Sequence, residues 1–233
     1  MSYRDSVATL KLLQQVHGRA TADERCATHP QSNVIALQAP ATARQRPGQA
    51  ACFGPGTRLA TPSGEVSVTD LSAGDLVETL DTGAQPIAWI NHVTAMGYGN
   101  DTPITIEAGV LGNSADLVVS QAQRLMIADG TTELLFGAGA VLVAARDLID
   151  LPGVTVTPVA RVTYSQILLA DHQLLIANGT PAESLFLDPN SLSSFDTPAR
   201  AALAPMGSCF GGHVAPYLTA QEAAVWRHYV HAA

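Results

Sequence analysis

Short apolar runs separated by turns dominate the chain from residue 52 onward. Gly, Pro, Asp and Asn residues lie between the runs, which is typical of strands joined by tight turns. The predicted strands are 57–60, 65–68, 76–80, 85–90, 104–106, 117–119, 124–127, 141–144, 154–162, 165–169 and 174–177. The predicted turns include 61–64, 81–83, 129–130 and 178–179. This pattern predicts an all-β domain that is closed or folded on itself.

The two ends of the chain follow different patterns. Apolar residues recur at three-residue steps over positions 5–17, which predicts a short amphipathic helix. Positions 21–51 combine prolines with little apolar periodicity, so they are predicted to form an extended linker. Near the C-terminus, Thr219 precedes Glu222 by three residues, a capping box that predicts a second short helix. The boundary between linker and β domain falls near Ala51.

Composition excludes several classes of protein. Of the 233 residues, 47% are hydrophobic and 14% are charged, so the chain can bury a core and is not globally disordered. The net charge is −8 and only 5% of the residues are aromatic. Nucleic-acid binders need a basic face, and single-strand binders also need stacking side chains. We therefore expect no nucleic-acid partner.

The sequence contains no apolar run as long as the roughly 18 residues of a membrane helix, so no membrane span is expected. The N-terminal segment lacks the continuous apolar stretch of a signal peptide. We expect a cytoplasmic protein, or one exported by a signal-free route. Cys26, Cys52 and Cys209 are widely spaced and odd in number, which indicates at least one free thiol and no disulfide framework or metal site.

Cys52 stands where the linker ends and the β domain begins. A thiol at this place can attack the carbonyl carbon of its own preceding peptide bond through a five-membered transition state, so proximity alone favours the reaction. A small buried hydrophobe at the start of a strand is the alternative interpretation. The position of Cys52 by itself leaves both interpretations open.

Three blocks of sequence bear on this choice. The first block, 52–89, opens with Cys-Phe-Gly-Pro-Gly-Thr, and the second, 117–126, reads Leu-Val-Val-Ser-Gln-Ala-Gln-Arg-Leu-Met. The third block, 164–184, ends in Ala-Asn-Gly-Thr-Pro-Ala-Glu-Ser. In this order the blocks closely resemble the hedgehog/intein (Hint) autoprocessing module in its bacterial form. The resemblance covers about 52–187.

The resemblance implies a horseshoe-shaped, pseudo-twofold all-β Hint fold and a self-processing reaction. Cys52 would be the nucleophile, and the Ala51–Cys52 bond would be cleaved after an N-to-S acyl shift. Ser120 would hydrogen-bond near the scissile peptide, and His172 would assist proton transfer. The substrate is then the N-terminal segment of the same chain, and water or a small nucleophile is the acyl acceptor. No cofactor or metal is implied.

The sequence departs from the family pattern at functional positions. Gln123 stands where the second block usually ends in a histidine, and Gln121 replaces the usual proline. Gln166 stands where bacterial members often carry His, and Ala170 where an acidic residue is common. Gln123 can still hold the scissile amide by a hydrogen bond, but it cannot act as a general acid, which is worth about 10²–10⁴ in rate. A degenerate, non-cleaving Hint fold that serves as a binding or scaffold module is therefore the alternative function.

Two further activities have less support. Splicing is not expected, because the sequence has no His-Asn pair whose Asn could cyclise, and the Asn-Gly at 178–179 is better explained as a turn. A trans-acting cysteine peptidase is a weaker hypothesis, because the chain lacks a Cys/His/Asn signature. We therefore expect an N-terminal helix and linker over 1–51, a Hint domain over 52–187, and a tail with a short helix over 188–233.

Overall fold

The computed structural model describes residues 37–38, 50–187, 192, 195, 200–201, 203–204 and 214–232. The helix predicted over 5–17 and nearly all of the predicted linker lie outside these residues. Cys26 and Cys209 also lie outside them.

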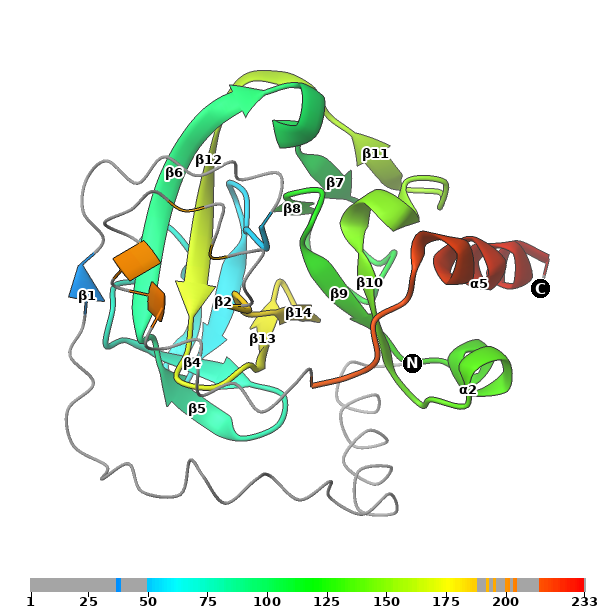
Figure 1. Ribbon diagram of the computed structural model, residues 1–233, viewed down its shortest axis with the longest axis horizontal. Coiled ribbons are helices and arrows are strands. Elements are labelled where there is room, and N and C mark those ends of the chain that lie inside the picture. The colour runs from blue at the N-terminus through cyan, green and yellow to red at the C-terminus, as the bar shows by residue number, and fades with distance from the viewer. Residues whose placement is uncertain are drawn as a thin grey trace.

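Strands are the predominant regular elements of the described residues, and many of their bounds follow the predicted runs closely (Figure 1). They are β1 Leu37–Gln38, β2 Arg58–Thr61, β3 Gly64–Ser67, β4 Leu76–Thr79, β5 Gly83–Pro86, β6 Trp89–Gly97, β7 Ile104–Ile106, β8 Leu117–Val119, β9 Arg124–Ile127, β10 Val141–Ala144, β11 Val154–Val156, β12 Val159–Leu168, β13 Leu174–Ala177 and β14 Thr180–Glu183. The helices are α2 Gly130–Phe136 and α5 Ala220–Ala232, with short 3-10 turns η3 Gly99–Asp101 and η4 Ala145–Leu148.

Within the described residues these strands form three sheets. The largest has the order β10-β9-β14-β13-β2-β3, with β4 and β5 attached through β13. The second has the order β1-β6-β12 and the third β11-β7-β8. All pairs are antiparallel except β1 with β6. The all-β fold predicted from the sequence is confirmed.

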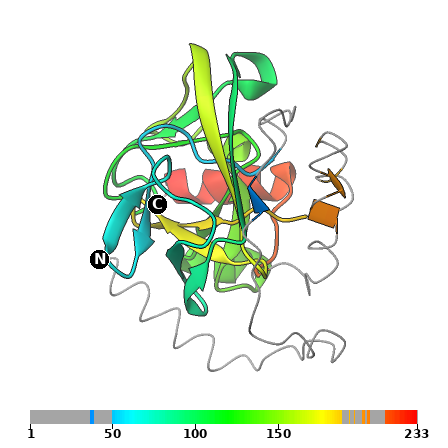
Figure 2. The ribbon, with the colours of Figure 1, turned by 90° about the vertical axis from the view of Figure 1, so that its left-hand side faces the viewer.

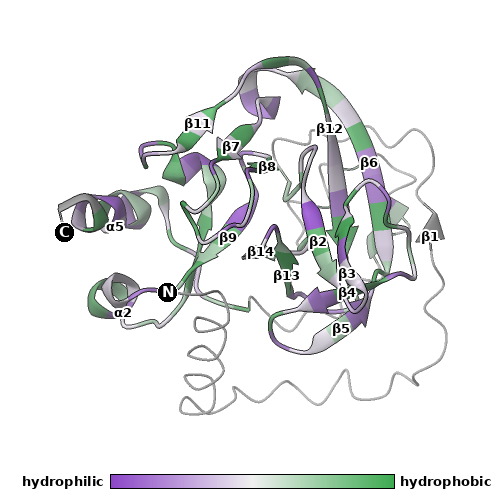
Figure 3. Ribbon diagram, turned by 180° about the vertical axis from the view of Figure 1, so that it is seen from behind, coloured by the Kyte–Doolittle hydropathy of each residue, from purple (hydrophilic) through white to green (hydrophobic). Residues whose placement is uncertain are grey.

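The two longest strands differ from the prediction. β6 and β12 lie side by side as a long pair (Figures 1 and 2). The sequence analysis predicts two strands, 154–162 and 165–169, where β12 is one, and it ends the strand that overlaps β6 at residue 90. Polar residues interrupt the apolar pattern in both strands, and hydrophilic and hydrophobic positions alternate along β6 in Figure 3. Several of these polar side chains pair across the ladder, for example Thr94 with Thr163 at 2.9 Å, so the strands continue through them.

The Asp-Gly at 129–130 begins a helix, and the predicted turn is wrong. Asp129 is the N-cap of α2 because its carboxylate accepts from the Thr132 backbone N–H at 2.8 Å, and the Thr132 hydroxyl pairs back to the cap. In contrast, the predicted turn at 178–179 is confirmed. Asn178 and Gly179 have φ values of 45° and 83° and join β13 to β14.

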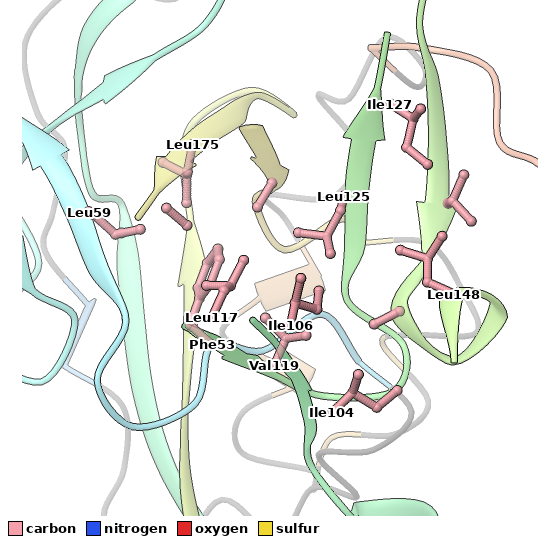
Figure 4. Close-up of a cluster of buried hydrophobic side chains, with 14 of the residues drawn as sticks. Phe53, Leu59, Ile104, Ile106, Leu117, Val119, Leu125, Ile127, Leu148 and Leu175 are labelled. Carbon is pink, nitrogen blue, oxygen red and sulfur yellow. The ribbon is translucent and has the colours of Figure 1, made fainter. Parts of the chain in front are cut away.

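The main core lies between the sheets and begins directly after Cys52. Phe53 is 1% exposed, pairs with Val119 of β8 and Ser165 of β12, and points into the cluster drawn in Figure 4. The next residue must be small, since a Cβ on Gly54 would lie 2.6 Å from Val118 Cγ1. The Cys-Phe-Gly sequence thus fixes the start of the domain between two sheets.

The C-terminal segment packs on the same domain. Tyr217 forms a parallel bridge to Leu142 of β10, and Trp226 of α5 is 3% exposed and donates to Asp129 Oδ2 at 3.0 Å. The predicted capping box is confirmed, because Glu222 Oε2 accepts from the Thr219 backbone N–H at 2.8 Å. Residues 214–232 are therefore continuous with the packing of the β domain.

Candidate functional site

Ser120 bridges the peptide unit that precedes Cys52. Its Oγ donates to the Ala50 carbonyl at 2.7 Å and accepts from the Cys52 backbone N–H at 3.2 Å. The Ser120 backbone N–H also donates to the Cys52 carbonyl at 3.0 Å. Ser120 directly follows β8, and Cys52 directly precedes the residue that pairs with β8, so the fold sets this contact. One buried hydroxyl thus spans Ala51 and holds the amide nitrogen of the Ala51–Cys52 bond.

The Cys52 thiol is fully buried. Its surroundings include the apolar side chains of Trp89, Leu168 and Leu185. Burial raises the pKa of the thiol to about 12, and hydrogen bonds with Gln166 and Ser120 offset only part of that rise. A thiol in this state is almost entirely protonated at neutral pH, and only the thiolate is a strong nucleophile.

Gln166 is a polar side chain that contacts the thiol directly. Its Nε2 donates to Cys52 Sγ at 3.3 Å, and its Oε1 accepts from Asn91 Nδ2 at 3.2 Å. Asn91 and Gln166 face each other in the β6–β12 ladder, so strand register positions the amide over the sulfur. A neutral amide can stabilise a thiolate by donating a hydrogen bond, but it cannot remove the thiol proton.

Gln123 is directed to a different partner. Its Nε2 donates to the Glu183 carbonyl at 2.9 Å and to the Arg124 carbonyl at 3.1 Å, while its buried Oε1 has no hydrogen-bond partner within the described part of the chain. The Cys52 backbone N–H is held by Ser120 instead. Gln123 therefore joins the turn after β8 to the end of β14, and its two protons are used on backbone carbonyls.

His172 belongs to a cluster around Glu183. The His172 Nε2 atom lies 3.0 Å from Glu183 Oε1, and both side chains are at most 2% exposed. The ring also packs against Phe186, with 4.7 Å between centroids. His172 follows β12 and Glu183 ends β14, so the β13–β14 hairpin brings them together.

Arg124 and Tyr217 complete this cluster. Arg124 Nη1 lies 3.3 Å from Glu183 Oε2, the Tyr217 hydroxyl donates to Glu183 Oε1, and the guanidinium stacks over the Tyr217 ring at 4.0 Å. Burial alone would raise the pKa of Glu183, but the contacts from His172, Arg124 and Tyr217 together hold it below its usual range. Glu183 is therefore a buried ionised carboxylate.

The structure thus brings Cys52, Ala51 and Ser120 together and places Gln123 and His172 on Glu183. The sequence analysis noted Gln166 only as a departure from the family pattern and did not single out Glu183. Gln166 carries a usable signal, because it is a polar residue inside a run of strand residues that are otherwise mostly apolar. Glu183 and Tyr217 lie in separate parts of the sequence, and only the fold pairs them.

No cluster of three His, Cys, Asp or Glu side chains suited to a metal ion occurs among the described residues. In the same part of the chain, no helix has the length and apolar character needed to cross a membrane.

Comparison with known proteins gives the class of this domain. The family model described as Hint domain matches residues 51–189, more than half of the chain. The chain therefore belongs to the Hint-domain family, within the hedgehog/intein class. Comparison with curated proteins finds no significant match.

Solved structures with similar folds include two inteins and an intein-like domain. The bacterial intein-like domain from Clostridium thermocellum is 14% identical over 57% of this chain and 97% of its own, with a TM-score of 0.38. The MchDnaB-1 intein is 15% identical and the gp41-1 intein 12%, each over 57% of this chain and 98% of its own, with TM-scores of 0.36.

Proposed function

We propose that this Hint domain cleaves its own chain at the Ala51–Cys52 bond and does so slowly. The observation that carries the proposal is the Ser120 bridge, which fixes the amide of that bond beside the Cys52 thiol. A buried hydroxyl that contacts both flanking peptide groups suits a scissile bond that must be held still while its neighbouring sulfur attacks.

The reaction has two steps. Cys52 Sγ bonds to the Ala51 carbonyl carbon, the carbon–nitrogen bond breaks, and the thiol proton is transferred to the Cys52 nitrogen, which becomes a free amine. Water, or another small nucleophile, then attacks the thioester and displaces the sulfur. With water the products are a segment ending in an Ala51 carboxylate and a domain beginning with Cys52. Splicing forms no part of the proposal.

Two features support a low rate. The pKa of the Cys52 thiol is raised to about 12, and the amide of Gln166 lies where a base would be most useful. Cleavage would therefore depend on a small thiolate population and on His172 to move protons. With the neutral amides of Gln123 and Gln166 where histidine is common, a loss of about 10²–10⁴ in rate is expected.

Intact mass spectrometry of the purified full-length chain tests the proposal. The chain is incubated for days with and without dithiothreitol, which would intercept a thioester. We expect two products, the larger beginning at Cys52, and faster cleavage with thiol. Cys52→Ala should abolish the products, whereas Cys209→Ala removes a thiol elsewhere and should preserve them. Unchanged products in Cys52→Ala would overturn the proposal, and cleavage that depends on protein concentration would indicate a trans-acting peptidase.

A second candidate is a non-cleaving Hint fold that serves as a binding or scaffold module. The specific observation in its favour is that neutral amides occupy both positions where histidine is common, and that the protons of Gln123 are used on backbone carbonyls. A single intact species that stays stable in thiol would favour this candidate. Cleavage restored by Gln123→His would then indicate loss of the acid as the cause.

A further inference from the structure

We infer that the edge of β6 opposite β12 binds the N-terminal segment of this same chain by strand addition. This contact keeps residues 1–51 attached to the domain after the Ala51–Cys52 bond is broken. The docking belongs to the intact chain and requires no cleavage, whereas the retention of the cleaved segment rests on the proposed function.

β1 is the strand that occupies this edge. It lies beside the beginning of β6 (Figure 1), in a three-stranded sheet with the order β1-β6-β12. The pairing is parallel, with Leu37 opposite Trp89 and Gln38 opposite Ile90. A strand edge presents unpaired N–H and C=O groups, and an extended peptide satisfies them by adding a strand. The N-terminal segment therefore contacts the domain at a point well before the scissile bond.

Ala50 is a second contact of the same segment. It is 4% exposed, and its carbonyl accepts from Ser120 Oγ at 2.7 Å. It lies in a buried apolar cluster that also contains Cys52 and Trp89. Trp89 therefore takes part in both contacts, because its backbone pairs with β1 and it belongs to the cluster around Ala50. Two separate points of the N-terminal segment thus converge on one residue of β6.

The charges of the two parts of the chain favour the same docking. Residues 1–51 carry six basic and three acidic side chains, whereas residues 52–233 carry six basic and seventeen acidic ones. Opposite net charges attract, and the attraction weakens as salt is added. A cationic segment is therefore held near an anionic domain, which raises the effective concentration of β1 at the edge of β6.

Cleavage leaves both contacts on the N-terminal product, because Leu37, Gln38 and Ala50 all precede the Ala51–Cys52 bond. Hydrolysis places a carboxylate on Ala51, next to the buried Ala50, and burial of an unpaired charge is costly. The contact at Ala50 is therefore weakened in the product. The β1–β6 pair then becomes the main contact that retains the segment.

A cut made by an added protease tests the docking without autoprocessing. A specific protease site is inserted between Thr42 and Ala43 of full-length Cys52→Ala, and the folded chain is cut there. Size-exclusion chromatography with mass detection, repeated over a dilution series, gives the dissociation constant of the N-terminal fragment. We expect a one-to-one complex, with a dissociation constant that rises as salt is added.

Proline substitutions test whether strand pairing holds this complex. Adjacent residues of a strand direct their N–H groups to opposite sides, so either Leu37 or Gln38 directs its N–H toward β6. The double variant Leu37→Pro/Gln38→Pro removes both N–H groups, and we expect the fragment to bind at least about tenfold more weakly. Ala27→Pro adds a proline to the same fragment ahead of β1 and should leave the dissociation constant unchanged.

Three outcomes would overturn the docking. They are separate elution of the parent fragment, equal retention of the parent and double-proline fragments, and a complex that forms only when two chains associate. The last outcome would assign the edge of β6 to a second copy of the chain.

The chain with Cys52 intact tests retention after self-cleavage. We expect its two products to separate in a denaturing mass spectrum and to remain together in a native one. Products that separate in both spectra would overturn the retention. If the denaturing spectrum shows no cleavage, the proposed function fails, and the protease-cut chain still decides whether β6 binds the N-terminal segment.

Discussion

Two buried polar clusters in this domain respond to burial in opposite ways. Around Cys52 the polar partners are a hydroxyl and an amide, and the pKa of the thiol rises to about 12. Around Glu183 the partners include a guanidinium and an imidazole, and the pKa of the carboxyl falls below its usual range. Burial opposes charge in both clusters, so the difference lies in the partners. The fold keeps the Cys52 thiol neutral and the Glu183 carboxylate charged.

The largest expected effect concerns the reactivity of Cys52. A rise of its pKa from the ordinary value of 9.0 to about 12 lowers the thiolate fraction at pH 8 about a thousandfold. We therefore expect iodoacetamide to alkylate Cys52 about a thousandfold more slowly in the folded chain than in the urea-unfolded chain. Peptide mass spectrometry measures both rates. Similar alkylation rates in the folded and the unfolded chain would mean that burial does not raise the pKa of the Cys52 thiol, and the contrast with Glu183 would fail.

Gln166→His should place an ionisable side chain beside the Cys52 thiol, as the cluster around Glu183 already has. An imidazole at this position would lie beside Sγ and could take the thiol proton, so we expect cleavage to accelerate about a hundredfold or more. Intact mass spectrometry measures the rate, and His228→Gln, which alters an exposed residue of α5, is the control. A folded Gln166→His variant with an unchanged rate would contradict the view that the amide limits the reaction.

Ser120→Ala should remove contacts around Cys52 and leave the contacts around Glu183 unchanged. The Cys52 N–H and the Ala50 carbonyl each lose their contact with the Ser120 hydroxyl, so the free energy of unfolding should fall by about 1–3 kcal/mol. Urea unfolding in a Cys52→Ala background measures the change, and Ser72→Ala at an exposed turn serves as the control. Cleavage of the Ser120→Ala chain should also be slower, and equal stability with equal cleavage would exclude a role for the bridge.

The smallest expected effect is a pH dependence of stability that comes from the charged cluster. Because the folded-state pKa of Glu183 is lowered from 4.5, its ionised form stabilises the fold above about pH 4.5, and this contribution is lost as the pH falls through the lowered value. Glu183→Gln should therefore be less stable than the parent at pH 7, and the difference should shrink at acid pH. Urea unfolding at several pH values checks this, and a constant difference would argue against an ionised Glu183.

Most strands could be predicted from the sequence, because apolar runs and Gly, Pro, Asp or Asn turns depend on local chemistry. The runs at 104–106, 117–119, 124–127, 141–144 and 174–177 have the observed bounds. The errors share one cause, which is that a polar residue can be explained locally in more than one way. Asp-Gly is typical of a turn, but Asp129 caps α2, and the polar residues within β6 and β12 interrupt the apolar pattern from which long strands are predicted.

The family, most of the strands and the position of Cys52 at the start of the domain can be predicted from the sequence, because each depends on short blocks of neighbouring residues. Which side chain contacts the sulfur and which contacts His172 depends on the folded arrangement. The Cys52–Gln166 contact spans 114 positions and the Tyr217–Glu183 contact spans 34, and each depends on strand register and packing. Burial, and with it the protonation of the thiol and of Glu183, likewise follows from the folded arrangement.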